Sequence, residues 1–281
     1  MIPSNFTYIK AKSVDEAVSL LQEHGDEARL LAGGHSLIPA LKLRLNDYQY
    51  LIDVSKITEL QQIAEKDGAI HIGAMVTHGA IVDSGLIQEK LSFFSQAADL
   101  IGDVQVRNLG TIGGSIAHAD PAADWPALLL AAEATVHVTG SNGGRSIAAE
   151  DFFHGLYTTA LEEGEIITSI SVPVRTGAKS AYVKFMQPAS RFAIVGCAAI
   201  VGGNGTAQDV RIAFSGVSAT PFRDKDVEAA LEGSALNDET IQAAAGKAAE
   251  GVSIMNDHYA SEDYRKQMAK VYCKSALASL Q

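Results

Sequence analysis

Two glycine pairs, each followed by a hydroxyl side chain, are the parts of this sequence best suited to bind a ligand. The first stands in Ala32-Gly33-Gly34-His35-Ser36 and the second in Thr111-Ile112-Gly113-Gly114-Ser115. Glycine has no Cβ, so consecutive backbone N–H groups can turn toward an anion, and hydroxyl groups extend the concave site that they form. Two such loops could hold one pyrophosphate, although paired glycines can also do no more than make turns. The residues alone leave both alternatives open.

Other arrangements that would indicate metal binding or catalysis are incomplete. The sequence has neither a GxxxxGK[ST] phosphate loop nor a GxGxxG pattern after its first strand. His118, Asp120 and Asp124 lack the further histidine that a hydrolytic metal site normally requires. Asp124 suits the start of a helix or a contact with a ligand hydroxyl. We therefore predict no metal site and name no catalytic residue.

The two glycine loops must be held by regular structure on either side. The hydrophobic pattern predicts a helix from Ser13, a strand at 29–31 leading into the first loop, a helix at 40–45 and a strand at 50–54. A hairpin is expected at 59–64 and 69–73, followed by helices at 77–83 and 86–101. Residues 105–126 show no period and are expected to form a long loop, which in a folded domain is usually functional. A helix at 125–132 follows.

The pattern changes near residues 175–180, which we take as the boundary before a C-terminal unit. Strands are expected at 181–185, 193–201 and 210–215, and helices at 224–231, 238–251 and 262–280. A run of strands followed by a run of helices is typical of an α+β unit. Cys197 lies in the second of these strands and Cys273 in the last helix, where we expect both to be small buried hydrophobes.

Composition narrows the classes of protein to which the chain can belong. Its 281 residues include 22 Lys and Arg against 33 Asp and Glu, a formal net charge of −11. That balance disfavours binding to nucleic acid or to an anionic membrane surface. Two cysteines cannot ligate an iron–sulfur cluster. We see neither a targeting segment nor an apolar run long enough to span a bilayer, and we expect a cytoplasmic protein.

The longer motifs resemble one known family. AGGHSL at 32–37 and TIGGSIAHADPAADWPALLLAAEA at 111–134 are similar to the FAD-binding medium subunit of the molybdenum hydroxylases, the group of carbon-monoxide dehydrogenase and xanthine dehydrogenase. The resemblance covers nearly the whole chain. It includes QVRN at 105–108, the segment 152–173 that begins with two Phe residues and ends in EEGEIITSISVP, and YVKF at 182–185. Xanthine dehydrogenases have Asn at the end of the second glycine loop, where this chain has Ser115.

The resemblance implies a fold and a cofactor site. Residues 1–175 would form an FAD-binding domain of the vanillyl-alcohol-oxidase type, with subdomains of about 1–57 and 58–175, and residues 176–281 a domain of small antiparallel sheet and helical bundle. FAD would lie between the lobes, with its pyrophosphate held by the two glycine loops. Asp124 would bind the ribose region of the adenosine, Ile101 and Ile167 would flank cofactor rings, and Lys184 would approach the cofactor from the second domain.

The resemblance also implies a function within a complex. The chain would be the electron-transfer subunit of a heterotrimeric molybdenum hydroxylase, passing electrons from iron–sulfur clusters to an external acceptor. A small subunit would carry the 2Fe-2S clusters and a large subunit the molybdopterin, in a dimer of heterotrimers. The alternatives are a stand-alone FAD oxidoreductase and a non-catalytic docking subunit whose flavin site has degraded.

Overall fold

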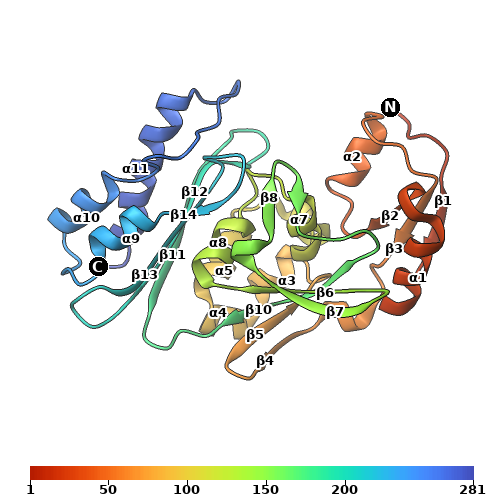
Figure 1. The fold of residues 1–281 in the computed structure, drawn as a ribbon, viewed down its shortest axis with the longest axis horizontal. Coiled ribbons are helices and arrows are strands. Elements are labelled where there is room, and N and C mark those ends of the chain that lie inside the picture. Colours follow the sequence, from red (N-terminus) through yellow and green to blue (C-terminus); the bar gives the residue numbers. More distant parts are fainter.

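Three sheets of three to five strands divide the chain into three successive units, and the computed structural model describes residues 1–281 (Figure 1). In the first unit, strands β1, β3 and β2 pair in parallel in that order. Helix α1 begins where the Ser13 hydroxyl accepts the N–H of Glu16, and its apolar side packs on this sheet. The elements are β1 (Thr7–Lys10), α1 (Val14–His24), β2 (Ala28–Leu31), α2 (Leu37–Lys42) and β3 (Tyr50–Asp53), with single 3-10 turns at Gly25–Glu27 and Thr58–Gln61.

The second unit is an antiparallel five-stranded sheet in the order β4-β5-β10-β6-β7, with helices packed on it. A short hairpin, β8 and β9, extends beyond the sheet (Figure 1). Its elements are β4 (Ile63–Lys66), β5 (Ala69–Gly73), α3 (His78–Asp83), α4 (Gly85–Lys90), α5 (Ser92–Asp99), α6 (Val104–Leu109), α7 (Ile112–His118), α8 (Trp125–Ala132), β6 (Thr135–Gly140), β7 (Gly143–Ala148), a 3-10 turn (Ala149–Asp151), β8 (Phe153–Gly155), β9 (Thr158–Thr159) and β10 (Ile166–Pro173).

Two sequence predictions for this unit are wrong. The single helix expected at 86–101 is two helices, α4 and α5, which meet at the buried Leu91. The long loop expected at 105–126 contains α6 and α7, and the second glycine pair lies in the first turn of α7. Glycine is a poor helix former, but the Thr111 hydroxyl caps this helix and backbone bonds from neighbouring segments fix its first residues. Contacts distant in sequence therefore override the local preference.

The third unit is an antiparallel sheet in the order β11-β12-β13-β14 with three helices on one face. Nine of the ten residues of β12 are buried, because both faces of the strand are covered. Cys197 and Ala199 point to the core shared with the C-terminal helices, and Ala198 and Ile200 point to the core of the second unit. The elements are β11 (Lys179–Met186), β12 (Ala193–Gly202), β13 (Gln208–Ser215), β14 (Phe222–Arg223), α9 (Lys225–Leu231), α10 (Asp238–Ala245) and α11 (Glu262–Ala278).

Helix α8 joins the second and third units. All of its residues from Trp125 to Ala132 are buried, because it packs against β10 on one side and against β12 and β13 on the other. The core around α8 therefore includes Tyr182, Ala198 and Ala213 of the third unit. The predicted α+β class is confirmed, while the domain limits at 57 and 175 stay predictions; apolar packing continues across residue 175.

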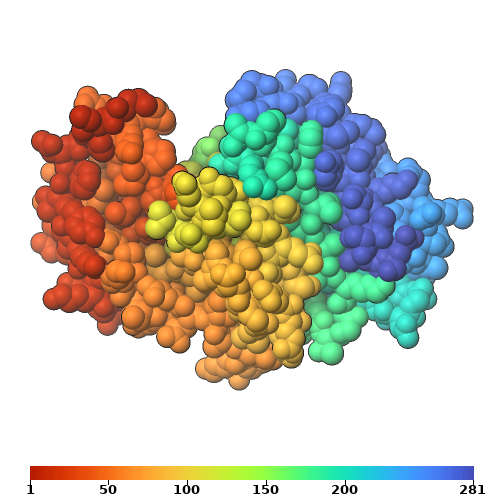
Figure 2. All heavy atoms as spheres, turned by 180° about the vertical axis from the view of Figure 1, so that it is seen from behind, coloured from red at the N-terminus to blue at the C-terminus, as the bar shows by residue number.

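The surface is hollowed between the units. Figure 2 shows an indentation between the N-terminal unit, in red and orange, and the C-terminal unit, in teal and blue, with the yellow segment that includes α6 beside it. None of the helices is both long and apolar enough to cross a lipid bilayer.

Candidate functional site

The two glycine loops lie against one another, although almost 80 residues separate them in sequence. A Cβ on Gly33 would stand 2.2 Å from the carbonyl oxygen of Leu109 and 2.8 Å from the Cα of Gly110. A Cβ on Gly114 would be 3.6 Å from that of Ala32. No side chain fits at Gly33, so this glycine is required for the first loop to approach the residues just before the second. The two loops are thus adjacent in the fold, and their joint binding of a pyrophosphate stays a prediction.

The first loop offers a row of free donors. The backbone N–H groups of residues 32–36 donate to no acceptor within the protein, and His35 and Ser36 are exposed. Gly34 has a φ of +72°, in the left-handed region that favours glycine. Consecutive N–H groups without protein partners suit the oxygens of a bound anion. The donor set of this loop therefore fits a diphosphate.

The second loop is built differently from the sequence expectation. Its N–H groups are already used: Ile112 donates to the Val76 oxygen at 3.1 Å, Gly113 to the Ala74 oxygen at 2.9 Å, and Gly114 to the Thr111 hydroxyl at 3.2 Å. The N–H of Ser115 donates to the Thr111 oxygen. What this loop still presents at the surface is the hydroxyl of the partly exposed Ser115. The N–H and the hydroxyl proton of Thr111 are also unused, but Thr111 is only 3% exposed. The expectation of a second row of free amides is corrected, because the amides of Ile112 and Gly113 fix the loop to the segment after β5 and the next two donate to Thr111.

Gly113 belongs to that attachment. A Cβ at this position would lie 2.5 Å from the Cβ of Ala74 and 2.7 Å from its carbonyl oxygen. Gly113 is fully enclosed, whereas Gly114 beside it is partly exposed and faces the first loop. Gly113 therefore allows close packing against Ala74, and Gly114 leaves the surface toward the first loop free of a side chain.

A buried histidine, His78, holds the residue just before the second loop, and no motif in the sequence indicated this role. The backbone N–H of His78 donates to the Gly110 oxygen at 2.9 Å, and its Nδ1 accepts the indole N–H of Trp125 at 3.3 Å. Burial, with the nearby charges of His35 and Arg107, lowers the pKa of His78 to about 3. The ring is therefore neutral and carries its proton on Nε2. It connects the second loop to the first residue of α8.

Asp124 and Lys184 form a buried ion pair between the second and third units. The Lys184 Nζ donates to Asp124 Oδ2 at 2.9 Å and to the Leu100 carbonyl oxygen at 3.1 Å, and the Tyr182 hydroxyl donates to Asp124 Oδ1. Burial raises the pKa of Asp124, while the charge of Lys184 and these hydrogen bonds oppose the rise. Both carboxylate oxygens therefore already accept protein donors. The predicted ribose contact of Asp124 and cofactor contact of Lys184 stay predictions.

The two predicted ring-flanking residues occupy the main core. Ile167 is buried, and Ile101 is partly buried against the same cluster. The carbonyl oxygen of Ile101 accepts a hydrogen bond from the Arg107 guanidinium at 3.2 Å. This bond fixes the backbone next to Leu100, whose carbonyl oxygen accepts from Lys184. Their proximity to a cofactor ring stays a prediction.

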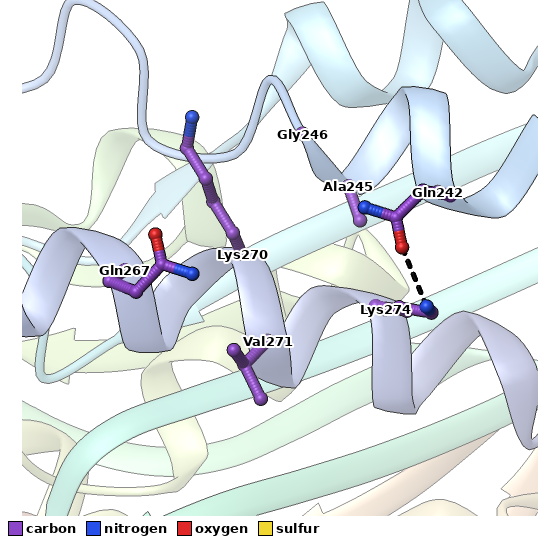
Figure 3. A pocket seen from close by; sticks show the side chains of 7 residues that line it. All are labelled: Gln242, Ala245, Gly246, Gln267, Lys270, Val271 and Lys274. Carbon is purple, nitrogen blue, oxygen red and sulfur yellow. Dashed lines mark hydrogen bonds between the residues drawn. The ribbon is translucent and has the colours of Figure 1, made fainter.

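The His118, Asp120 and Asp124 side chains do not converge. The ring of His118 packs on Tyr157 with 5.1 Å between centroids, and Asp120 accepts hydrogen bonds from Tyr157 and from the N–H of Ala122. No group of three or more His, Cys, Asp or Glu side chains could hold a metal ion. A surface pocket between α10 and α11 is lined by residues that include Gln242, Gln267, Lys270 and Lys274 (Figure 3). It lies in the third unit and contains none of the predicted site residues.

Two family models together match almost the whole chain. A family model described as the FAD binding domain in molybdopterin dehydrogenase matches residues 4–175. A second, described as the CO dehydrogenase flavoprotein C-terminal domain, matches residues 180–280.

Individual relatives match over almost their full lengths. The glyceraldehyde dehydrogenase medium chain of Sulfolobus acidocaldarius is 38% identical over 277 residues, covering 98% of both chains. The carbon monoxide dehydrogenase medium chain of Hydrogenophaga pseudoflava is 42% identical over 279 residues, covering 99% of this chain and 97% of that one. In the solved structure of the Hydrogenophaga pseudoflava carbon monoxide dehydrogenase, which lacks the Mo-pyranopterin moiety, a chain superposes with a TM-score of 0.96. The superposition covers 100% of this chain and 98% of that chain, at 43% identity.

Proposed function

The chain belongs to the family of FAD-binding medium subunits of molybdenum hydroxylases such as carbon monoxide dehydrogenase, and on that premise we propose that it is the electron-transfer subunit of its complex. In this role it stands between iron–sulfur clusters on a small subunit and an external electron acceptor, and a large subunit carries the molybdopterin. We further propose that two such heterotrimers form a dimer and that the complex resides in the cytoplasm. The two cysteines, both buried in the C-terminal core, are consistent with clusters held elsewhere.

We propose that the two glycine loops bind the pyrophosphate of FAD. The first loop supplies the five unpaired N–H groups of residues 32–36. The second supplies the hydroxyls of Thr111 and Ser115, while Gly114 keeps the surface toward the first loop free of a side chain. Bound FAD supplies reversible one- and two-electron chemistry, and the protein supplies placement and electrostatics.

The remaining predicted residues would enclose the rest of the cofactor. Asp124 would accept from the ribose region through lone pairs not used by Tyr182 and Lys184. Lys184, whose ammonium donates to Asp124 and to the Leu100 oxygen, would lie beside the cofactor from the third unit. Ile101 and Ile167 would border the rings from the apolar core. Each of these contacts depends on the loops holding the pyrophosphate nearby.

The row of unpaired amides in the first loop is the observation that carries the proposal, and ligand discrimination tests it. Titrations of the purified chain, and of its assembled complex, with FAD, ADP and riboflavin would separate pyrophosphate binding from ring binding. We expect FAD to bind with a stoichiometry of about one, ADP to compete with it, and riboflavin to bind at least about tenfold more weakly, since each charge-assisted hydrogen bond contributes about 1.5–3 kcal/mol.

A variant pair makes the test specific to the loops. Gly114→Val would place methyl groups between the loops and is expected to weaken FAD binding at least about tenfold, about 1.4 kcal/mol. Gly85→Val is the control, because a Cβ there meets nothing within 4 Å. Equal affinity for riboflavin and FAD would overturn the pyrophosphate assignment. An assembled complex that contains molybdenum and iron but binds no FAD would favour the docking alternative.

A further inference from the structure

One arginine far from the glycine loops is buried against backbone. Arg265 in α11 is 2% exposed. Its Nη1 donates to the carbonyl oxygens of Ile194 and Gly216, both at 2.6 Å, and its Nε donates to the Met255 oxygen at 3.2 Å. Its Nη2 is paired with Asp257 at 2.8 Å. The guanidinium therefore spans the start of β12 and the end of β13 and fixes their separation.

These two strand ends hold the segment that leads to Asp124. The N–H of Ala193, next to Ile194, donates to the Ala122 oxygen at 3.0 Å. The N–H of Gly216 donates to the Pro121 oxygen at 2.6 Å. The carbonyl groups of Pro121 and Ala122 are thus held by the two backbone segments that Arg265 connects. Asp124 follows two residues later, and α8 begins directly after it.

The local geometry leaves little freedom in this connection. Gly216 has a φ of +76°, and a Cβ there would lie 2.6 Å from the Ala193 oxygen and 2.8 Å from the Ile194 oxygen. The strand ends are consequently in close backbone contact around the guanidinium. Arginine offers five donors in a rigid planar fork, which a lysine ammonium cannot reproduce across several acceptors. The identity of this side chain, beyond its charge, therefore determines where the strand ends lie.

We propose that Arg265 is a positioning residue that holds the segment Pro121–Asp124 in place, and through this segment the Asp124–Lys184 pair at the cofactor site. Arg265 acts from the opposite side of the C-terminal sheet, through Ile194 and Gly216 and then through the carbonyl groups of Pro121 and Ala122. The consequence for FAD rests on the function proposed above. The consequence for the segment itself does not, since these hydrogen bonds are internal to the protein.

The first experiment measures the segment without FAD. Amide hydrogen exchange of the full chain is compared among the wild type, Arg265→Met and Arg265→Lys, following peptides that cover residues 119–124. Methionine fills a similar volume, and the Asp257 side chain that it leaves unpaired is 37% exposed and so stays solvated. Because removing one partner of a buried ion pair is costly, Arg265→Lys keeps the charge should methionine fail to fold. The control is Cys273→Ala, which opens a cavity on the same helix in the C-terminal core, away from the Arg265 contacts.

We expect exchange in residues 119–124 to accelerate at least about tenfold in both arginine variants. In Cys273→Ala it should remain near the wild-type rate, even if the melting temperature of this variant falls as much as that of the arginine variants. Unchanged exchange in the arginine variants, or equal acceleration in Cys273→Ala, would overturn the proposal.

The second experiment extends the test to the cofactor. The dissociation constant of FAD is expected to rise at least about tenfold in Arg265→Lys and to change less than about twofold in Cys273→Ala. The visible circular dichroism of the bound flavin should change only in Arg265→Lys. A wild-type chain that does not bind FAD would contradict the proposed function, and the exchange experiment would still decide the positioning role. Normal FAD binding by Arg265→Lys, beside a wild type that binds, would overturn the extension to the cofactor.

Discussion

Single residues in the two loops have separate physical roles that their similar sequences conceal. The free amides of residues 32–36 can serve a ligand, whereas those of residues 112–115 serve the protein itself. The positions of both loops were predictable, because glycine pairs with hydroxyl neighbours are visible in the sequence. The division of roles was not predictable, because it depends on Ala74 and Val76, which pair with the second loop only in the fold.

His78 provides a prediction at the scale of one residue. Because burial lowers its folded pKa to about 3 from an ordinary 6.5, the unfolded chain binds a proton there before the folded chain does. Its contribution to stability is therefore full above about pH 6.5 and is lost as the pH falls toward 3, by up to about 1.4 kcal/mol per pH unit. Urea unfolding of the wild type and His78→Gln, measured between about pH 7 and pH 4, should show the steeper loss in the wild type. Parallel curves would contradict this assignment.

Among the secondary-structure elements, α8 shows both the strength and the limit of sequence patterns. Its predicted range of 125–132 agrees with the structure, because an uninterrupted apolar run bounded by an acidic start is a clear signal. That both sides of α8 are covered by different sheets could not be foreseen. α7 was missed for the opposite reason, since its glycines have low helix propensity and its support comes from distant backbone.

Truncating a buried side chain of α8 should therefore lower the stability of the second and third units together. Leu129 is fully buried between the sheets, and Leu129→Ala is expected to lower the free energy of unfolding by about 2–5 kcal/mol. Leu156→Ala is the control, because that side chain is 55% exposed and should change the value by less than about 0.5 kcal/mol. Calorimetry should show one shifted transition in Leu129→Ala. Two separate transitions, only one of them shifted, would contradict the shared core.

For the whole molecule, the second and third units are also joined by charges at the end of α8. Glu133 accepts hydrogen bonds from Arg175, from Arg211 at 2.9 Å and from Arg223 at 2.8 Å. Burial alone would raise the pKa of Glu133, but these three arginines lower it below its ordinary value. The pairing thus stabilises the fold above that ordinary pKa and is lost as the pH falls through the lowered one.

Neutralising this junction should weaken the contact between the units to a limited extent. Because the Glu133 side chain is 41% exposed, solvent screens the interaction, and Glu133→Gln is expected to lower the free energy of unfolding by about 1 kcal/mol. The loss should shrink in about 1 M salt, where the screening length is short. Glu150→Gln, an exposed carboxylate outside the junction, serves as the control. A loss that does not depend on salt would indicate that the charges are not its cause.

The position of α8 also has a consequence for how the protein is made. The core around this helix draws residues from Ile70 to Ala213, so a chain emerging from the ribosome exposes one apolar side of α8 until β13 has been synthesised. The cofactor-binding part therefore cannot complete its folding ahead of the C-terminal part, and a nascent chain paused before residue 213 would present that apolar surface to chaperones and to other unfinished chains.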